Sequence, residues 1–307
     1  MKNKGFLQIS FQWLFAIIAG IIILFLTIYG VTRLIGIGER TQEIKGSEEL
    51  GILLNPLETG FEEARSSIID LQVDTRIYTF CNDFGDFGKQ EISMSQKSFG
   101  KWPEPGEKVV FYNKYVFSES PLEARRIYLF SKPFEFPYKV ANLIYMTSGY
   151  KTYCFKDAPE DIEDEIERLD IDNILVEECP INSINICFES GEDCEINVNY
   201  LNRYVDKDGE RVYFEGDALM YAAIFSDTAD YECQLKRLMK RVASLAELYK
   251  DKANLVSISG CNTNLDTDLE LLINMCEALG SSGYLTNIQE HVDDLDNKNK
   301  VSICKLW

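Results

Sequence analysis

The feature that most constrains this chain is an uncharged, apolar run near its N-terminus. No Asp, Glu, Lys or Arg occurs from Gly5 to Thr32. The twenty residues from Trp13 to Thr32 read WLFAIIAGIIILFLTIYGVT. As an α-helix they would extend about 30 Å, the thickness of the hydrocarbon core of a bilayer. Backbone groups inside lipid must be satisfied within the segment. We therefore predict one N-terminal transmembrane helix, with the lipid bilayer as its partner, followed by a large soluble domain.

The rest of the chain is strongly acidic. The 307 residues contain 31 Lys and Arg and 50 Asp and Glu, which gives a formal net charge of −19. Five basic and two acidic residues precede residue 47, so the domain behind the helix has a net charge of −22. Such a surface repels phosphate backbones, and we therefore predict no nucleic-acid partner. Cations and basic proteins are the partners that this charge favours.

Nine cysteines occur singly behind the apolar run, and none forms a C-x-x-C pair. Zinc sites need clustered Cys and His, but His291 is the only histidine, so we predict no structural zinc. Scattered cysteines in an anchored domain are typical of an oxidising compartment, and we expect at least one disulfide. The odd number leaves one thiol unpaired within the chain or bonded to another chain.

The orientation of the helix is not decided by charge, because basic residues flank both of its ends. The cysteine distribution and the short N-terminal tail favour a large domain outside the cytoplasm. The apolar run continues through bulky residues to Tyr29, so we expect the helix to be retained rather than removed as a signal peptide.

A short motif precedes the apolar run. Gly5 ends a basic segment, and Gln8, Ser10 and Gln12 follow at alternate positions. This N-terminus resembles those of archaeal type IV pilin-like proteins with class III signal peptides, in which Gly precedes a Q-x-S-x-E pattern. The resemblance implies processing at this site and a pilin-like role. Two residues separate Gly5 from Gln8, and Gln12 stands where pilins have the Glu that registers subunits, which argues against filament assembly. The whole chain also resembles archaeal single-pass membrane proteins of this layout.

Three regions are expected along the chain. Residues 1–46 contain the transmembrane helix and a neck, residues 47–135 are β-rich, and residues 136–307 alternate between helix and strand. The last two regions form either one domain or two. The predicted fold class is therefore mixed α/β (α+β), behind one N-terminal helix.

In the region from residue 136 onward, periodicity and turn signals predict individual elements. The expected helices are 136–148, 159–169, 231–250, 265–280 and 286–295, and the expected strands are 151–155, 173–179, 254–259 and 301–307. One hairpin is expected around residues 189–193, with Cys187 and Cys194 at its two shoulders as the best disulfide candidates. A second hairpin is expected at Asp208-Gly209, a type I′ turn signal that we prefer to a calcium loop.

Two of the expected helices carry further signals. The helix 231–250 has an apolar stripe at helical spacing and a basic opposite face formed by Lys236, Arg237, Lys240 and Arg241. We expect this basic face to pair with carboxylates of the domain, with docking of an anion as the alternative. In the helix 265–280, Thr267 and Glu270 have the spacing of a capping box and Gly280 is the expected stop.

No catalytic constellation stands out, and we assign no catalytic, cofactor-binding or metal-binding residue. His291 lies on a polar helix and is expected to be solvated, while Ser257–Cys261 is expected to be a loop after a strand. The Asp-Phe-Gly repeat at residues 83–88 is expected to be a surface loop, since no other kinase motif accompanies it. The acidic runs 160–172 and 189–195 are interpreted as solvated surface.

These observations favour a membrane-anchored envelope protein with a structural, adhesive or pilin-like role and with protein partners in the envelope. The alternatives are a membrane-tethered hydrolase or sensor domain, and an accessory subunit of a membrane complex. A deep pocket that gathers carboxylates from both 47–135 and 136–307 would favour an enzyme. A flat, aromatic-rich face would favour a binding module.

Overall fold

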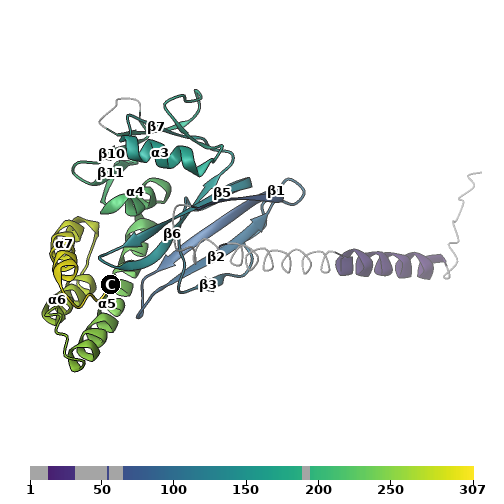
Figure 1. The fold of residues 1–307 in the computed structure, drawn as a ribbon. Coiled ribbons are helices and arrows are strands. Elements are labelled where there is room, and N and C mark those ends of the chain that lie inside the picture. Colours follow the sequence, from purple (N-terminus) through teal and green to yellow (C-terminus); the bar gives the residue numbers. More distant parts are fainter. Residues whose placement is uncertain (1–12, 32–53, 55–64, 189–193) are drawn as a thin grey trace, which may run out of the picture.

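The computed structural model describes residues 13–31, 54, 65–188 and 194–307. Trp13–Val31 form a helix of 19 residues that is long and apolar enough to cross a membrane. Its side chains are not buried by the rest of the protein, and it projects away from the globular part (Figure 1). The predicted fold class, a mixed α/β domain behind one N-terminal apolar helix, is confirmed.

The first sheet contains the first six strands of the globular part. These strands are β1 (Arg65–Asn82), β2 (Lys89–Gln96), β3 (Val109–Phe111), β4 (Tyr115–Phe117), β5 (Leu122–Glu135) and β6 (Lys139–Ser148). Their order in the sheet is β3-β2-β1-β5-β6-β4. Neighbouring strands run antiparallel, except that β4 is parallel to β6 at the edge.

The second sheet mixes parallel and antiparallel strands in the order β12-β11-β10-β9-β7-β8. Its members are β7 (Tyr153–Lys156), β8 (Ile174–Val176), β9 (Ile184–Phe188), β10 (Ile196–Asn199), β11 (Tyr204–Lys207) and β12 (Glu210–Tyr213). The four neighbouring strands β10, β9, β7 and β8 are parallel to one another. Helix α3 (Glu160–Leu169) is the crossover between β7 and β8. The last three strands form an antiparallel meander.

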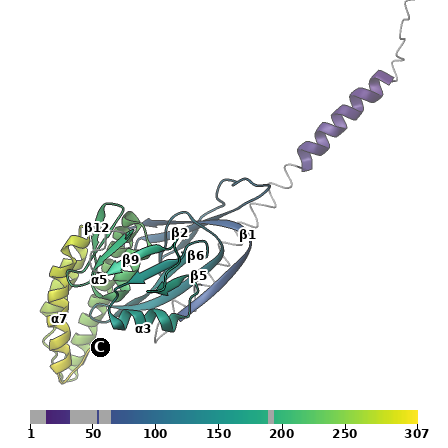
Figure 2. The ribbon, with the colours of Figure 1, turned by 90° about the horizontal axis from the view of Figure 1, so that it is seen from above.

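Helices α4 (Gly216–Phe225) and α5 (Thr228–Ile258) are shared by the two sheets. Helix α4 contacts β5 and β6 of the first sheet and β11 of the second, and α5 contacts β1, β4, β6 and β12. Helices α6 (Asp266–Glu277) and α7 (Leu285–Val301) follow, joined by the short helix η1 (Ser282–Tyr284); α6 packs on α5 and α7 on α6. This helical part lies at the end of the globular part away from the N-terminal helix (Figures 1 and 2).

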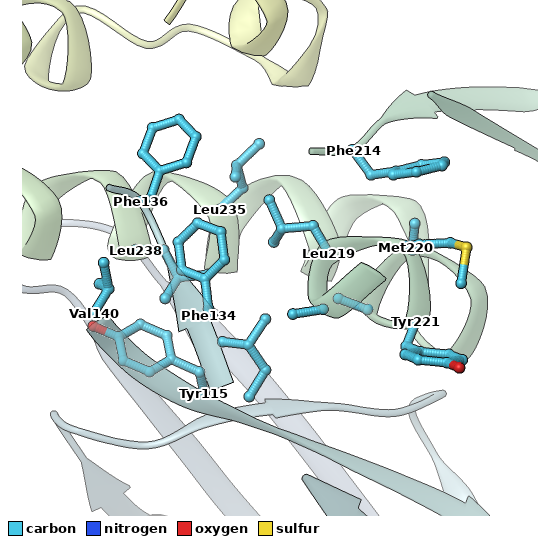
Figure 3. Close-up of a cluster of buried hydrophobic side chains, with 14 of the residues drawn as sticks. Tyr115, Phe134, Phe136, Val140, Phe214, Leu219, Met220, Tyr221, Leu235 and Leu238 are labelled. Carbon is cyan, nitrogen blue, oxygen red and sulfur yellow. The ribbon is translucent and has the colours of Figure 1, made fainter. Parts of the chain in front are cut away.

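An aromatic core links the two sheets through α4. The ring of Phe225 lies 5.5 Å from Phe130 of β5 and 5.1 Å from Tyr153 of β7, both edge to face. Tyr145 of β6 stacks near Phe130 and donates a hydrogen bond from Oη to the backbone oxygen of Ala218 at 2.6 Å. Figure 3 shows part of this core, with side chains from the first sheet facing those of α4 and α5. Such contacts stabilise both sheets against the same helices.

The guanidinium of Arg237, in the middle of α5, is fully buried. It donates hydrogen bonds to the backbone oxygens of Phe87, Tyr112 and Lys114 at 3.3, 3.0 and 3.1 Å, and to Oε1 of Gln234 at 2.6 Å. Lys240 of the same face behaves in the same way, since it donates to the backbone oxygens of Asp83 and Gly85. The expected pairing of this face with carboxylates is therefore wrong for these two residues. Backbone carbonyls of the loops at one end of the first sheet accept instead.

Four pairs of cysteines lie at disulfide distance, with Cα atoms 5.7 to 6.0 Å apart, which confirms the expectation of a disulfide-bearing domain. The pairs are Cys81–Cys233, Cys154–Cys179, Cys187–Cys194 and Cys261–Cys304. The ninth cysteine, Cys276, is buried on α6 with its sulfur 3.9 Å from that of Met239, and burial raises the pKa of its thiol to about 12. It is therefore inaccessible to another chain in the folded protein.

Residues 136–148 were expected to be a helix, but most of them form β6. The reason is that both faces of this strand are buried. Tyr145 faces the aromatic core, whereas Ile144 and Met146 belong to an aliphatic cluster on the opposite face of the sheet, which also contains Leu54. A strand buried on both sides reads as a continuous apolar run, which a sequence pattern does not distinguish from a buried helix.

Three other local expectations are wrong. Residues 254–258 continue α5 instead of forming a strand, because the helix stop is Gly260. Gly260 has a φ of +87°, and the N–H groups of Gly260 and Cys261 donate to the oxygens of Ser257 and Val256, which is a Schellman motif. Residues 301–307 form no strand, and the buried Leu306 holds them against the helices. Strands β9 and β10 are parallel neighbours in the second sheet and do not form the expected hairpin.

Of the other two local signals, the turn is confirmed and the helix cap is wrong. The hairpin at Asp208-Gly209 is confirmed, with β11 antiparallel to β12 and φ values of +53° and +80° at the two turn residues. The capping box is wrong, because α6 begins after Leu265 with no side-chain cap and ends at Glu277, before Gly280.

The aromatic core makes the protein sensitive to alkali. Burial raises the pKa of eight tyrosines, namely Tyr115, Tyr138, Tyr145, Tyr153, Tyr200, Tyr221, Tyr231 and Tyr249. Their neutral phenols stabilise the fold below the unfolded pKa of about 10, and this stability is lost as the pH rises above it. We expect these phenols to ionise together with unfolding when phenolate absorbance and near-ultraviolet circular dichroism are followed between pH 9 and 13. Ionisation of all sixteen tyrosines with an intact dichroism signal would contradict this.

Candidate functional site

A cluster of charged side chains lies where α3, α4 and β5 meet. Nζ of Lys132 on β5 lies 2.5 Å from Oε2 of Glu165 on α3 and 3.2 Å from Oδ2 of Asp217 on α4. All three side chains are largely buried. One lysine therefore bridges two carboxylates that come from different helices, and it ties the first sheet to both of them.

Two phenols complete this cluster. Tyr221 donates a hydrogen bond from Oη to Glu165 at 3.3 Å, and Tyr200 donates one to Oδ1 of Asp217 at 3.0 Å. Burial, with a smaller effect of the nearby carboxylates, raises the pKa of both phenols. They remain donors at neutral pH, so each carboxylate of the cluster is paired with both a cation and a hydroxyl.

The cluster borders a cavity of about 430 Å³, which Asp161 and Arg168 also line. Its carboxylates all come from the region 136–307, and the region 47–135 contributes only Lys132 and Pro133. The cavity therefore does not gather carboxylates from both regions, which was the pattern that would favour an enzyme. Because Lys132 pairs directly with both Glu165 and Asp217, this arrangement is that of a structural ion-pair network.

A second hollow, of about 780 Å³, is lined in part by Tyr200. Asn197, Asn199 and Tyr204 line it, and Nδ2 of Asn199 donates to Oη of Tyr204 at 3.2 Å. Asp206, also in its wall, forms a two-point ion pair with Arg211, whose guanidinium stacks on the ring of Tyr204 at 3.7 Å. Amides and phenols can hold a neutral polar molecule by hydrogen bonds, but they supply neither a nucleophile nor a general base at neutral pH.

The carboxylate of Glu215, directly before α4, is buried. Its Oε2 is ion-paired with Arg203. Burial raises the pKa of this carboxyl above the usual value for Glu. A perturbed carboxyl of this kind is a site candidate only when it opens to a cleft. Glu215 is absent from the lining of the two hollows above, so we interpret it as part of the core.

His291 differs from its expectation as a solvated residue. It lies on α7 and is partly buried, and its Nε2 is 2.8 Å from the backbone oxygen of Asp268 on α6. Its hydrogen bond thus joins two helices. Ser257 lies in the last turn of α5, and Cys261 is paired with Cys304, so neither is presented as a nucleophile.

The remaining residues named from the sequence fall in three places. Cys187 and Cys194 form one of the four disulfide pairs, at the ends of the segment between β9 and β10. The acidic run 160–172 includes α3, where Glu165 is not solvated surface but a member of the ion-pair network. The motif Gly5, Gln8, Ser10 and Gln12, together with residues 189–193, lies outside the described residues.

Sequence reasoning missed the Lys132 network and the role of Arg237. Lys132 is 33 residues from Glu165 and 85 from Asp217, and no local spacing relates them. Within the described parts of the chain, no group of three His, Cys, Asp or Glu side chains is placed to hold a metal ion. Comparison with known proteins shows no matching family model, no matching curated protein and no matching solved structure.

Replacing Lys132 distinguishes structure from ligand binding at this network. We expect Lys132→Met to lower the free energy of unfolding by about 1–3 kcal/mol, because two largely buried carboxylates lose their cation. The matched control is Lys298→Met, which removes an exposed lysine that also pairs with two carboxylates and should change stability by less than about 1 kcal/mol. Urea unfolding of both variants measures this. An unchanged or raised midpoint for Lys132→Met would show that the lysine is kept for a ligand rather than for stability.

Proposed function

We propose that this chain is a single-pass, membrane-anchored protein of the cell envelope, with its globular domain outside the cytoplasm and a structural or adhesive role. The observation that carries the proposal is the combination of the apolar helix Trp13–Val31 with four cysteine pairs spread over the globular part. Disulfides of this number persist in oxidising compartments and are rare where thiols are kept reduced.

The distribution of the pairs supports a mechanical role. Cys81–Cys233 ties the end of β1 to α5, and Cys261–Cys304 ties the end of α5 to the C-terminal segment. The first of these closes a loop of 152 residues, for which the chain-entropy account assigns about 5 kcal/mol. A domain fastened in this way suits a permanent envelope component. In the first hollow Lys132 is paired with Glu165 and Asp217, and in the second Asp206 is paired with Arg211, which favours binding or support over catalysis.

The pilin-like N-terminus belongs to the same proposal. Processing after Gly5 would leave the apolar helix at the mature N-terminus, as in type IV pilin-like proteins. The specific observation that favours the alternative, a tethered sensor or hydrolase, is the cavity of about 430 Å³ beside Lys132 and Asp217. An accessory subunit of a membrane complex would have the same anchor and the same orientation.

The experiment is intact-mass spectrometry of the full chain from its native membranes, alkylated under denaturing conditions with and without reductant. We expect one alkylated cysteine without reductant, Cys276, and nine after reduction. Nine alkylated cysteines without reductant would contradict an extracytoplasmic domain. The same spectrum gives the mature N-terminus. A start at Phe6 or Gln8 supports pilin-like processing, and a start at Met1 rules it out.

A further inference from the structure

The loop between β1 and β2 presents two phenylalanines to solvent. The side chain of Phe84 is 89% exposed and that of Phe87 is 46% exposed. Single exposed apolar residues are common on protein surfaces and need no explanation. This loop differs because several hydrogen bonds hold its backbone although both rings are exposed to solvent.

The backbone is held on both sides of Phe84. Nζ of Lys240 donates to the oxygen of Asp83 and, at 2.8 Å, to that of Gly85. The N–H of Phe84 donates to Oδ1 of Asn82 at 2.9 Å. The loop then turns at Gly85, whose φ of +84° suits glycine. The carbonyls before and after Phe84 are therefore bound by one ammonium group of α5.

The other end of the loop is held against α5 as well. Nε of Arg237 donates to the backbone oxygen of Phe87. A Cβ at Gly88 would lie 2.5 Å from the backbone oxygen of Asn82, so only glycine fits at this position without a shift of the backbone. The disulfide pair Cys81–Cys233 joins the strand directly before the loop to the same helix. The backbone that carries both phenylalanines is thus held by a helix, which is a rigid support for a loop.

Arg237 also holds the loop between β3 and β4, since Nη2 donates to the oxygen of Tyr112 at 3.0 Å. The side chain of Tyr112 is 63% exposed. One buried guanidinium therefore binds the backbones of two loops whose aromatic side chains face outward. We call Phe84, Phe87 and Tyr112 the aromatic edge.

The surroundings of the aromatic edge at Phe87 are acidic. Beside Phe87 lies a hollow of about 500 Å³, which Asp86, Glu247 and Glu277 line together with Lys240. The ammonium of Lys240 is engaged by the two carbonyls, and that of Lys236 lies 4.0 Å from a carboxylate oxygen of Asp83. A partner that fits this surface has basic groups for the carboxylates and apolar side chains for the rings.

The aromatic edge lies at the far end of β1, beside α5. Strand β1 has 18 residues, which span about 55 to 60 Å when extended. It ends at the loop, beside α5 and away from the side on which the N-terminal helix projects (Figures 1 and 2).

We propose that the aromatic edge docks a basic, apolar polypeptide segment of another envelope protein. This inference rests on the proposed function, because it takes the domain to be displayed outside the cytoplasm. Aromatic side chains on a held backbone bind with little loss of conformational entropy, and such residues dominate many interfaces. Lys240 and Arg237 hold the backbone of these loops before a partner binds, so less conformational entropy is lost on docking.

The test uses the full chain in nanodiscs of zwitterionic lipid, with empty nanodiscs as the reference. The probes are two fluorescent peptides of equal length and charge, a Lys-Leu-Gly repeat and a Lys-Gly-Gly repeat, measured by anisotropy. We expect the Lys-Leu-Gly peptide to bind at least about tenfold more tightly, and Phe84→Ala to remove most of that difference. Lys240→Met keeps Phe84 but frees its backbone, and we expect a loss of several-fold.

The matched control is Phe99→Ala, which removes a phenylalanine that is 96% exposed but lies in the turn after β2. It should leave binding unchanged within a factor of two. Equal binding of the two peptides, or equal effects of Phe84→Ala and Phe99→Ala, would overturn the proposal. Since binding is measured on purified protein, its failure is independent of the thiol count and the mature N-terminus that test the anchored, exported domain.

Discussion

The buried guanidinium of Arg237 is the interaction on which the arrangement of the first sheet and the helices depends. A charge with no solvent contact is costly unless its donors are all used, and here three backbone carbonyls and Gln234 accept from it. Burial lowers the pKa of Arg237, yet an arginine remains charged far above neutral pH. The carbonyls that it binds belong to two loops at one end of the sheet. Without it, those acceptors would lie unpaired against α5.

Helix α5 connects the first sheet to the rest of the fold. On one side it contacts β1, β4 and β6, and its neighbour α4 carries the rings that reach Phe130 in the first sheet and Tyr153 in the second. On the other side it supports α6, and through α6 it supports α7. The Lys132 network adds a polar contact between the same layers. Two sheets of different topology are thus stabilised by one pair of helices.

The elements that could be predicted are those whose signal is local. The apolar stripe of α5 is confirmed, with Leu235, Leu238 and Val242 buried, because a helix with one buried face repeats every 3.6 residues. The turn at Asp208-Gly209 is confirmed because it needs two residues with positive φ. Strand β6 could not be recognised, since both of its faces are covered by parts of the chain that are distant in sequence. The parallel pairing of β9 with β10 is likewise decided by the sheet and not by the turn.

The site residues show the same limit. A basic residue on an apparent helix surface looks solvated in sequence, but the loops that cover Arg237 come from around 120 to 150 residues earlier in the chain. The spacing of cysteines indicated Cys187 and Cys194 because they are seven residues apart, whereas Cys81 and Cys233 meet only through the packing of β1 on α5. Local motifs therefore predicted the apolar helix and one disulfide pair, whereas the other contacts depend on tertiary packing.

Helices α4 and α5 join the two sheets into one cooperative unit. Amide hydrogen exchange of the full chain in detergent micelles, read by mass spectrometry, measures this cooperativity. We expect peptides from β5, α5 and β11 to exchange through one opening, with free energies that agree within about 1 kcal/mol. If β7 to β12 exchange at a free energy several kcal/mol below that of β5 and β6, the sheets unfold separately and do not form one unit.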